Sequence, residues 1–388
     1  MRRAYLDNAS STPLRKEVLK TMTNVLKYTF GNPSSLQHSY GRSVRSIIEE
    51  SRIIIANNIN SSSYEILFTS GGTESNNLVI QLSINNLDVK HFITSKLEHS
   101  SVLQTIYSLS KKQNISTSFV NFDSNGTLDL NHLEEHLKKC SSKKILVSLM
   151  YANNEIGNLL LDLNNVIFLC KKYNAYFHSD TIQFIGNFPI DMKQLQIDFV
   201  TASAHKFYGP KGVGFIFIRE NILKNIKFYL INNCREYGIR PGTENVSGIA
   251  GLSKALELSS NNFSDHIKKI LELKSYCILK LKEIIPDIIF NGLSSNFEKS
   301  IPSILNFLYP IKKVDYLFYF QLDLMGISIS KGSSCDSSNN EISHVIQSIV
   351  DKSLLKKMMP VRVSFGIFNK KKDIDLLIES LQKVTKII

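Results

Sequence analysis

The sequence predicts an α/β protein with a large domain built on a mostly parallel central sheet and a smaller α+β domain after it. Short apolar runs alternate with amphipathic stretches from about residue 60 onward, a repetition typical of parallel sheets with helical connections. After about residue 255 the pattern changes to a long lysine-rich helical stretch followed by isolated strands. A chain of 388 residues is long enough for two domains. We therefore expect a large domain at 14–255 and a small domain at 256–388, with the N-terminal segment 1–13 associated with the latter.

The strands expected in the large domain are short runs rich in β-branched and aromatic residues. They are EILF (65–68), HFITS (91–95), KKILVSLM (143–150), AYFHSD (175–180), DFVTASAH (198–205) and GVGFIFI (212–218). Helical periodicity follows the first three runs, in TESNNLVIQLSI, in SVLQTIYSLS and around VIFLCKKY. In such sheets ligands bind outside the carboxyl ends of the strands, so polar residues at those ends are the first candidates for a site.

The expected small domain begins with the helical stretch IKKILELKSYCILKLKEII, which precedes SILNFLYP. A helix-like DYLFYFQLDLMG, the polar stretch SKGSSCDSSNNE, the alternating strand PVRVSF and a terminal helix complete it. The chain shows no internal repeat.

Composition limits the classes of function. The formal net charge of +12 favours acidic partners or RNA, or reflects a composition rich in Asn, Lys, Ile and Ser. No block of like charges resembles a nucleic-acid arm, so we expect no direct DNA binding. The five cysteines are dispersed without a CxxC pair, which argues against a zinc site or a disulfide framework and suits a reducing compartment. We see neither a secretory signal nor a membrane-spanning stretch, and expect a cytoplasmic protein without membrane contact.

Polar groups follow several expected strands. Gly71, Gly72 and Thr73 stand at a helix start, where free backbone N–H groups favour an anion, although Thr73 with Glu74 is also an ordinary cap. His99 follows HFITS, a position where a lone histidine more often has a structural role than a functional one.

Two further strand ends complete the set. Asp180, with Gln183 after it, ends AYFHSD and serves either as a helix cap or as a site carboxylate. Ser203, His205 and Lys206 end DFVTASAH. An anion cradle, a carboxylate, a histidine and a lysine together are what pyridoxal 5'-phosphate (PLP) requires, because the lysine binds it covalently and the carboxylate keeps its ring nitrogen protonated.

Ten motifs carry a resemblance to a known family along essentially the whole chain. They are YLDNASSTP (5–13), GNPSSLQH (31–38), FTSGGTESNN (68–77), EH (98–99), NNEIG (153–157), HSDTIQ (178–183), SAHKFYGPKG (203–212), RPGTEN (240–245), KGSSC (331–335) and VRVSFG (361–366). With these motifs the sequence resembles the NifS/IscS-type cysteine desulfurases, within the class V aminotransferases of fold-type I PLP enzymes.

The resemblance implies a role for each matching residue. The PLP-binding residues would be Gly72, Thr73, Asn154, Asp180, Gln183, Ser203, His205, Lys206 and Thr243, the last reaching the phosphate from the neighbouring subunit of a homodimer. His99 would stack on the ring and assist proton transfer, while Asn154 and Arg362 would bind the carboxylate of L-cysteine. The planar guanidinium of an arginine can donate two parallel hydrogen bonds to a carboxylate, which supports this role for Arg362 independently of the resemblance.

Cys335 would be the nucleophile that takes the sulfur as a persulfide, and its polar, Gly- and Ser-rich surroundings suit a thiol that must move. Cys234 is the other cysteine considered for this role. The products would be L-alanine and sulfur for iron–sulfur cluster assembly or tRNA thiolation, passed to an acceptor or scaffold protein. No metal is expected in the site.

Three functions stay open on the sequence. The first is a cysteine desulfurase, the second a selenocysteine lyase or another PLP-dependent C–S lyase of the same fold, and the third a diverged homologue that acts mainly as a binding or scaffold subunit. Cys335 separates the first two, because a lyase does not need it.

Overall fold

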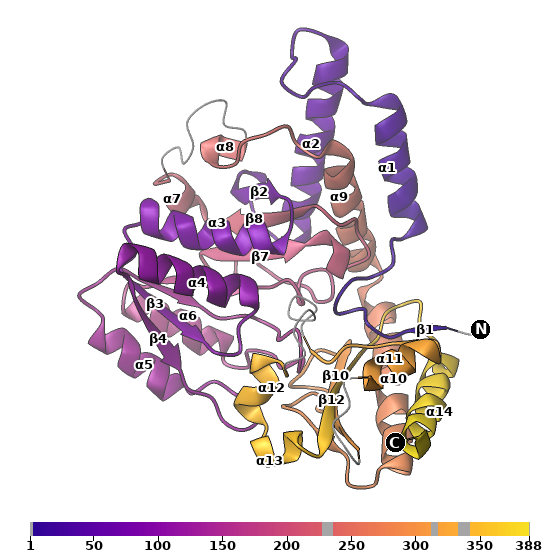
Figure 1. Cartoon of the computed structure of the whole chain (residues 1–388). Helices are drawn as coiled ribbons and strands as arrows, with labels where there is room; N and C mark the ends of the chain where they lie inside the picture. Colours follow the sequence, from indigo (N-terminus) through magenta and orange to yellow (C-terminus); the bar gives the residue numbers. More distant parts are fainter. Residues whose placement is uncertain (1–2, 227–235, 312–316, 333–341, 388) are drawn as a thin grey trace.

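The computed structural model describes residues 3–226, 236–311, 317–332 and 342–387, and Figure 1 shows the arrangement of its helices and strands. The described strands form sheets of seven, three and two strands. Cys335 and Cys234 lie outside the described residues.

The elements around the larger sheet follow one another without interruption by the smaller one. In chain order they are α1 (Lys16–Tyr28), α2 (Ser39–Asn58), a 3-10 turn (Ser63–Glu65), β2 (Ile66–Thr69), α3 (Gly72–Asn85), β3 (His91–Ser95), α4 (Ser100–Gln113), β4 (Ser116–Val120), α5 (Leu130–Lys139), β5 (Ile145–Ser148), α6 (Leu163–Lys172), β6 (Tyr176–Asp180), β7 (Phe199–Ser203), a second 3-10 turn (Ala204–Lys206), β8 (Gly214–Ile218), α7 (Glu220–Leu223), α8 (Glu236–Ile239) and α9 (Val246–Asn261).

This sheet has the strand order β2-β8-β7-β6-β5-β3-β4, with β8 antiparallel to both its neighbours and the other pairs parallel. Strands β3, β5, β7 and β8 are buried at every position, as expected of strands covered by helices on both faces. One face packs on α1, α2, α5, α6 and α9, and the other on α3, α4 and α7. The predicted α/β class with a mostly parallel sheet is confirmed.

The remaining elements form the second region, at the lower right of Figure 1, where the indigo strand β1 joins segments coloured salmon to yellow. They are β1 (Ala4–Tyr5), α10 (Phe263–Ile284), β9 (Ile289–Phe290), β10 (Ile304–Pro310), α11 (Phe318–Leu324), β11 (Ile327–Ser328), α12 (His344–Ile349), α13 (Lys352–Leu355), β12 (Met358–Ser364) and α14 (Lys371–Ile387). An antiparallel sheet of order β12-β10-β9 packs on α10, α11 and α14.

The N-terminal segment belongs to the core of this second region. Strand β1 pairs in parallel with β11, and Ala4 and Leu6 are buried among side chains of α10, α14 and β12. This contact supports the expected association of residues 1–13 with the small domain. Helix α9 runs past residue 255 while packing on α1 and α2, so the division at 14–255 and 256–388 stays a proposal.

Two local expectations differ from the structure. Strand β7 ends at Ser203, and the next three residues form a 3-10 turn, so Lys206 lies on the turn rather than in the strand. Strand β4 was not among the expected strands, because its sequence STSFV is polar and only its last residue is fully buried at the sheet edge. Within the described residues no helix is long and apolar enough to cross a lipid bilayer.

Candidate active site

A cavity of about 220 Å³ lies at the carboxyl ends of the parallel strands. The structure brings these predicted residues to its wall: Gly72, Thr73, His99, Asn154, Asp180, Gln183, Ser203, His205, Lys206 and Arg362. Thr243 is exposed and does not line this cavity, so its role in the site stays a prediction. Cys335 falls outside the described residues and has no place in this geometry.

Two glycines shape the start of α3. Gly71 has a φ of +148°, which side chains rarely adopt, and a Cβ on Gly72 would lie 2.2 Å from Cδ1 of Ile182. The helix is capped at Gly71 without a side-chain hydrogen bond, so the alternative role of Thr73 as the cap is excluded. The Thr73 hydroxyl lies instead in the first turn on the cavity wall, where it adds to the N–H groups that attract an anion.

Asp180 is buried at the end of β6 and is held in a fixed orientation. Its Oδ2 accepts from Nδ2 of Asn76 at 2.8 Å, and its Oδ1 accepts from the backbone N of Ile182 at 3.0 Å. Asn76 is held in turn, because its Oδ1 accepts from Oγ1 of Thr201 at 2.8 Å. The described residues thus give this carboxylate only neutral donors, and a cation beside it would gain a full charge interaction.

Lys206 reaches back to the N-terminal segment. Its Nζ donates to the carbonyl oxygens of Ala9 at 2.6 Å and Ser10 at 2.9 Å. Gln183 donates from Nε2 to the same Ala9 carbonyl at 3.0 Å. One stretch of backbone therefore fixes both side chains at the cavity wall.

The two histidines of the cavity are held in different ways. His99 caps α4, and its Nδ1 accepts from the backbone N of Ser101 at 3.1 Å. Nδ1 of His205 lies 3.2 Å from Oγ of Ser11. Burial and, to a lesser extent, Lys206 and Lys211 lower the pKa of His205 to about 4, so its ring is neutral near pH 7. Neutral His205 still carries one N–H and can donate it to an anion.

Arg362 lies on β12 and enters the cavity from the second region, 1% exposed. Its Nη1 donates to the carbonyl of Asn154 at 2.8 Å, so the two residues predicted to bind the substrate carboxylate are in contact. Its Nη2 donates to Oδ1 of Asp7 at 2.9 Å and to Oγ of Ser10 at 2.7 Å.

Sequence reasoning missed three residues of this site. Asp7 and Asn76 lie inside quoted motifs, where adjacency to residues with assigned roles was the only signal. Glu98 adjoins His99, is 1% exposed and accepts from the backbone N of Met150 at 2.8 Å. Burial raises the pKa of Glu98 well above its usual value, because the charged carboxylate is poorly solvated there.

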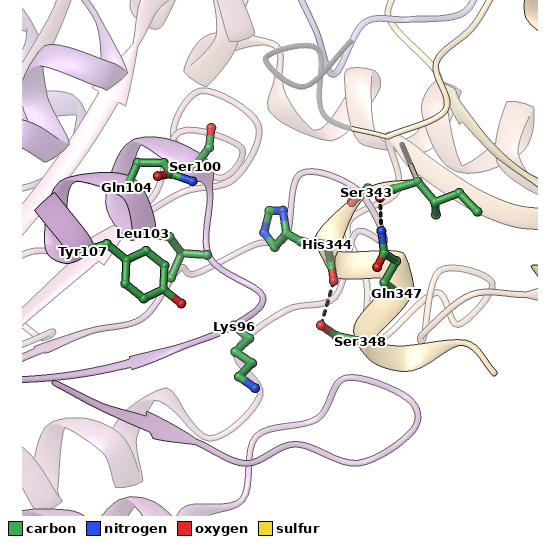
Figure 2. Close-up of a pocket in the computed structure, with 10 residues that line it drawn as sticks. Lys96, Ser100, Leu103, Gln104, Tyr107, Ser343, His344, Gln347 and Ser348 are labelled. Atoms are coloured by element: carbon green, nitrogen blue, oxygen red, sulfur yellow. Dashed lines mark hydrogen bonds between the residues drawn. The ribbon is translucent and has the colours of Figure 1, made fainter. Parts of the chain in front are cut away.

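A second cavity of about 410 Å³ lies between α4 and α12 (Figure 2). Lys96, Leu103 and Tyr107 line one wall and His344 the other. Nε2 of His344 lies 3.0 Å from the carbonyl of Glu98, which ties α12 to the loop that carries His99. Within the described chain, none of the residues predicted for the site line this second cavity.

The comparison with protein families decides the classification, because residues 4–377 match the family described as Aminotransferase class-V. The chain belongs to the class-V aminotransferases. Members of this family depend in general on PLP, and the cavity fits that group, with a lysine, an isolated buried carboxylate and an anion-binding helix start at its wall.

This class-V aminotransferase has full-length relatives. It is 39% identical over 387 residues to a protein named cysteine desulfurase IscS from Dictyoglomus turgidum, covering 99% of this chain and 94% of the relative. It is 35% identical to the protein of that name from Buchnera aphidicola, covering 98% and 92%. A solved NifS-like protein from Rickettsia africae superposes with a TM-score of 0.85 at 32% identity, covering 99% of this chain and all of that one. The predicted family resemblance is confirmed.

Proposed function

We propose that this class-V aminotransferase is a PLP-dependent cysteine desulfurase, which converts L-cysteine to L-alanine and leaves the sulfur as a persulfide on Cys335. The observation that carries the proposal is the meeting of Lys206 and Arg362 at one cavity, both hydrogen-bonded to Ser10. Lys206, which would bind the cofactor covalently, and Arg362, which would bind the carboxylate of an amino acid, thus lie at the same cavity. The relatives named cysteine desulfurase support the choice of substrate.

Each predicted residue has a physical basis for holding the cofactor. Lys206 would bind PLP covalently, Asp180 would keep the ring nitrogen protonated and Gln183 would donate to the ring hydroxyl. His99 would cover the ring face. The N-terminal turn of α3 would bind the phosphate, together with Thr73, Ser203 and His205. When bound, PLP supplies an electron sink for the pair released at the substrate α-carbon.

The substrate steps fall to side chains of the chain itself. Arg362 and Asn154 orient L-cysteine through its carboxylate, and the Lys206 amine removes the α-proton. The Cys335 thiolate then forms a bond to the substrate sulfur, the Cβ–S bond breaks, and its electron pair stays with the carbon skeleton. After protonation, with His99 assisting, that skeleton leaves as L-alanine. The balance is one L-cysteine and one thiol to one L-alanine and one persulfide.

A homodimer with shared sites is part of the proposal. Large apolar side chains are exposed along α1 and between it and the start of α2, and such gatherings mark interaction surfaces. They are Leu19, Leu26, Tyr28, Phe30 and Tyr40. Thr243 is exposed just before the start of α9, which packs on both of these helices, and so is available to a neighbouring subunit. The persulfide would pass to an acceptor or scaffold protein.

The test is made on the purified protein loaded with PLP. We expect L-cysteine to yield stoichiometric L-alanine and, with a thiol reductant, sulfide. Lys206→Ala removes the covalent anchor and the base, so it should lose both the yellow colour of the bound cofactor and all alanine release.

Cys335→Ala should keep the colour and lose persulfide formation, with Cys234→Ser as its matched control. Undiminished persulfide delivery by Cys335→Ala would contradict the role of that thiol. Activity on selenocysteine alone, independent of Cys335, would favour the lyase.

A further inference from the structure

The two N–H groups of Nη2 and one N–H group of Nη1 of Arg362 already donate hydrogen bonds within the chain. Nη2 donates to Asp7 and to Ser10, and Nη1 donates to the carbonyl of Asn154. Nε is buried without a hydrogen-bond partner in the described chain. A carboxylate that approaches a guanidinium end-on uses one N–H from each terminal nitrogen, and one that approaches from the side uses Nε and Nη2. Both binding geometries use an N–H of Nη2. An incoming carboxylate must therefore replace either Asp7 or Ser10 as the acceptor of one hydrogen bond from Nη2.

Asp7 is fixed by its backbone independently of the arginine. Its carbonyl accepts from the Tyr5 hydroxyl at 3.1 Å and from the backbone N of Ser10 at 3.0 Å. The neighbouring Leu6 donates from its backbone N to Ser328 at 2.9 Å. With its backbone held on both sides, the Asp7 carboxylate stays beside the guanidinium when a second carboxylate arrives. Its side chain is 17% exposed, so water screens its charge only in part.

We propose that Asp7 is a positioning residue that acts through Arg362 and sets the affinity of the site for the carboxylate of its substrate. It neutralises and orients a buried guanidinium, and it repels the carboxylate that must share that guanidinium. The inference rests on the proposed function, because it takes Arg362 as the receptor of the L-cysteine carboxylate. Asp7 then weakens ground-state binding more than it affects the chemical step, and its signature is a change in KM with little change in kcat.

Asp7→Asn is the decisive variant, since the amide keeps the shape and an oxygen acceptor but loses the charge. In the PLP-loaded enzyme we expect the KM for L-cysteine to fall on the order of tenfold. We expect kcat to stay within about twofold. A role confined to holding Arg362 in place predicts the opposite sign, because a looser arginine binds the carboxylate less well.

Two thiols that each lack one group of L-cysteine separate the interactions. 3-Mercaptopropionate has the thiol and the carboxylate, and its inhibition constant should be lower in Asp7→Asn, as the KM is. Cysteamine has the thiol and the amine but no carboxylate, so its inhibition constant should not change. 3-Mercaptopropionate should also raise the melting temperature of Asp7→Asn more than that of the wild type, a readout that needs no turnover. Glu134→Gln is the matched control, because it removes one carboxylate from an exposed ion pair with Lys172.

An unchanged or raised KM for L-cysteine in folded Asp7→Asn would overturn the inference, and so would an equal shift for cysteamine. If Asp7→Asn does not fold, Asp7→Ser is measured in its place. A wild-type enzyme that releases no alanine from L-cysteine would overturn the proposed function instead, so the two failures are distinguishable.

Discussion

Lys274 provides a quantitative test of the packing behind the site. It lies on α10 with a relative exposure of 0%, and its Nζ donates to Oγ of Ser300 at 2.9 Å and to the carbonyl of Ile301 at 3.0 Å. Burial without an opposing carboxylate lowers its pKa from 10.5 to about 7. The backbone N of Ile301 donates to Gly157, in the turn that also carries Asn154, so Lys274 supports one wall of the cavity.

The sign of the pH effect follows from proton binding. In the unfolded chain Lys274 keeps its proton up to its ordinary pKa of 10.5, whereas in the folded chain it loses it near pH 7. Between these values the unfolded state binds more protons, so the free energy of unfolding rises with pH. From pH 7 to pH 9 the gain from this one group is about 2 kcal/mol. Lys274→Met keeps much of the length of the side chain but removes the charge, and so should lose that gain.

The measurement is urea unfolding followed by circular dichroism at pH 7 and pH 9. The quantity to compare is the difference between wild type and variant, because cysteine and tyrosine ionisation affects both proteins alike. Lys268→Met, at an exposed position of the same helix, should retain the wild-type difference. An equal gain in Lys274→Met and wild type would refute the assignment of a lowered pKa to Lys274.

Two further predictions concern buried groups. Arg52 donates to both carboxylate oxygens of Glu236, at 2.8 and 2.9 Å. Glu236→Gln leaves the buried arginine without its counter-charge, so it should lower the free energy of unfolding by about 3–5 kcal/mol. Urea denaturation measures this loss, with Glu220→Gln as the exposed control. Burial lowers the pKa of His178 to about 3, so only the unfolded state gains its proton as the pH falls from 7.5 to 5.5, and stability should drop by about 1.4 kcal/mol. In His178→Gln the free energy of unfolding should fall less between pH 7.5 and pH 5.5 than in the wild type. The same fall in both proteins would count against a neutral buried His178 ring.

The sequence indicated residues that the structure brings to one cavity, because the signals at these positions are local. His99, Asp180 and Lys206 each follow an apolar run, and parallel strands bring such positions to one edge of a sheet. The missed partners depend on distant pairing. Asp180 and Asn76 are 104 residues apart, and no periodicity in either segment indicates that they meet.

Element ends were also harder to predict than element types. The 3-10 turn after Ser203 is closed by local backbone hydrogen bonds, because the carbonyl of Ala204 accepts from the backbone N of both Phe207 and Gly209. A Cβ on Gly209 would lie 2.8 Å from that of Ala204, so the turn closes only with glycine there. The apolar run continues through Ala204, whereas the strand ends at Ser203. The run alone therefore overestimates the length of the strand.

The N-terminal segment 7–12 explains why the two regions form one site. Ala9 and Ser10 accept from Lys206 on the large sheet, while Asp7 and Ser10 accept from Arg362 on the small one. Neither sheet alone places an amine beside a guanidinium. A displacement of this segment would therefore move the contacts of Lys206, the proposed anchor of the cofactor, and of Arg362, the proposed receptor of the substrate carboxylate, together. Backbone carbonyls of this segment hold the Lys206 amine and its side chains hold the Arg362 guanidinium, so the positions of the two groups depend on the same six residues.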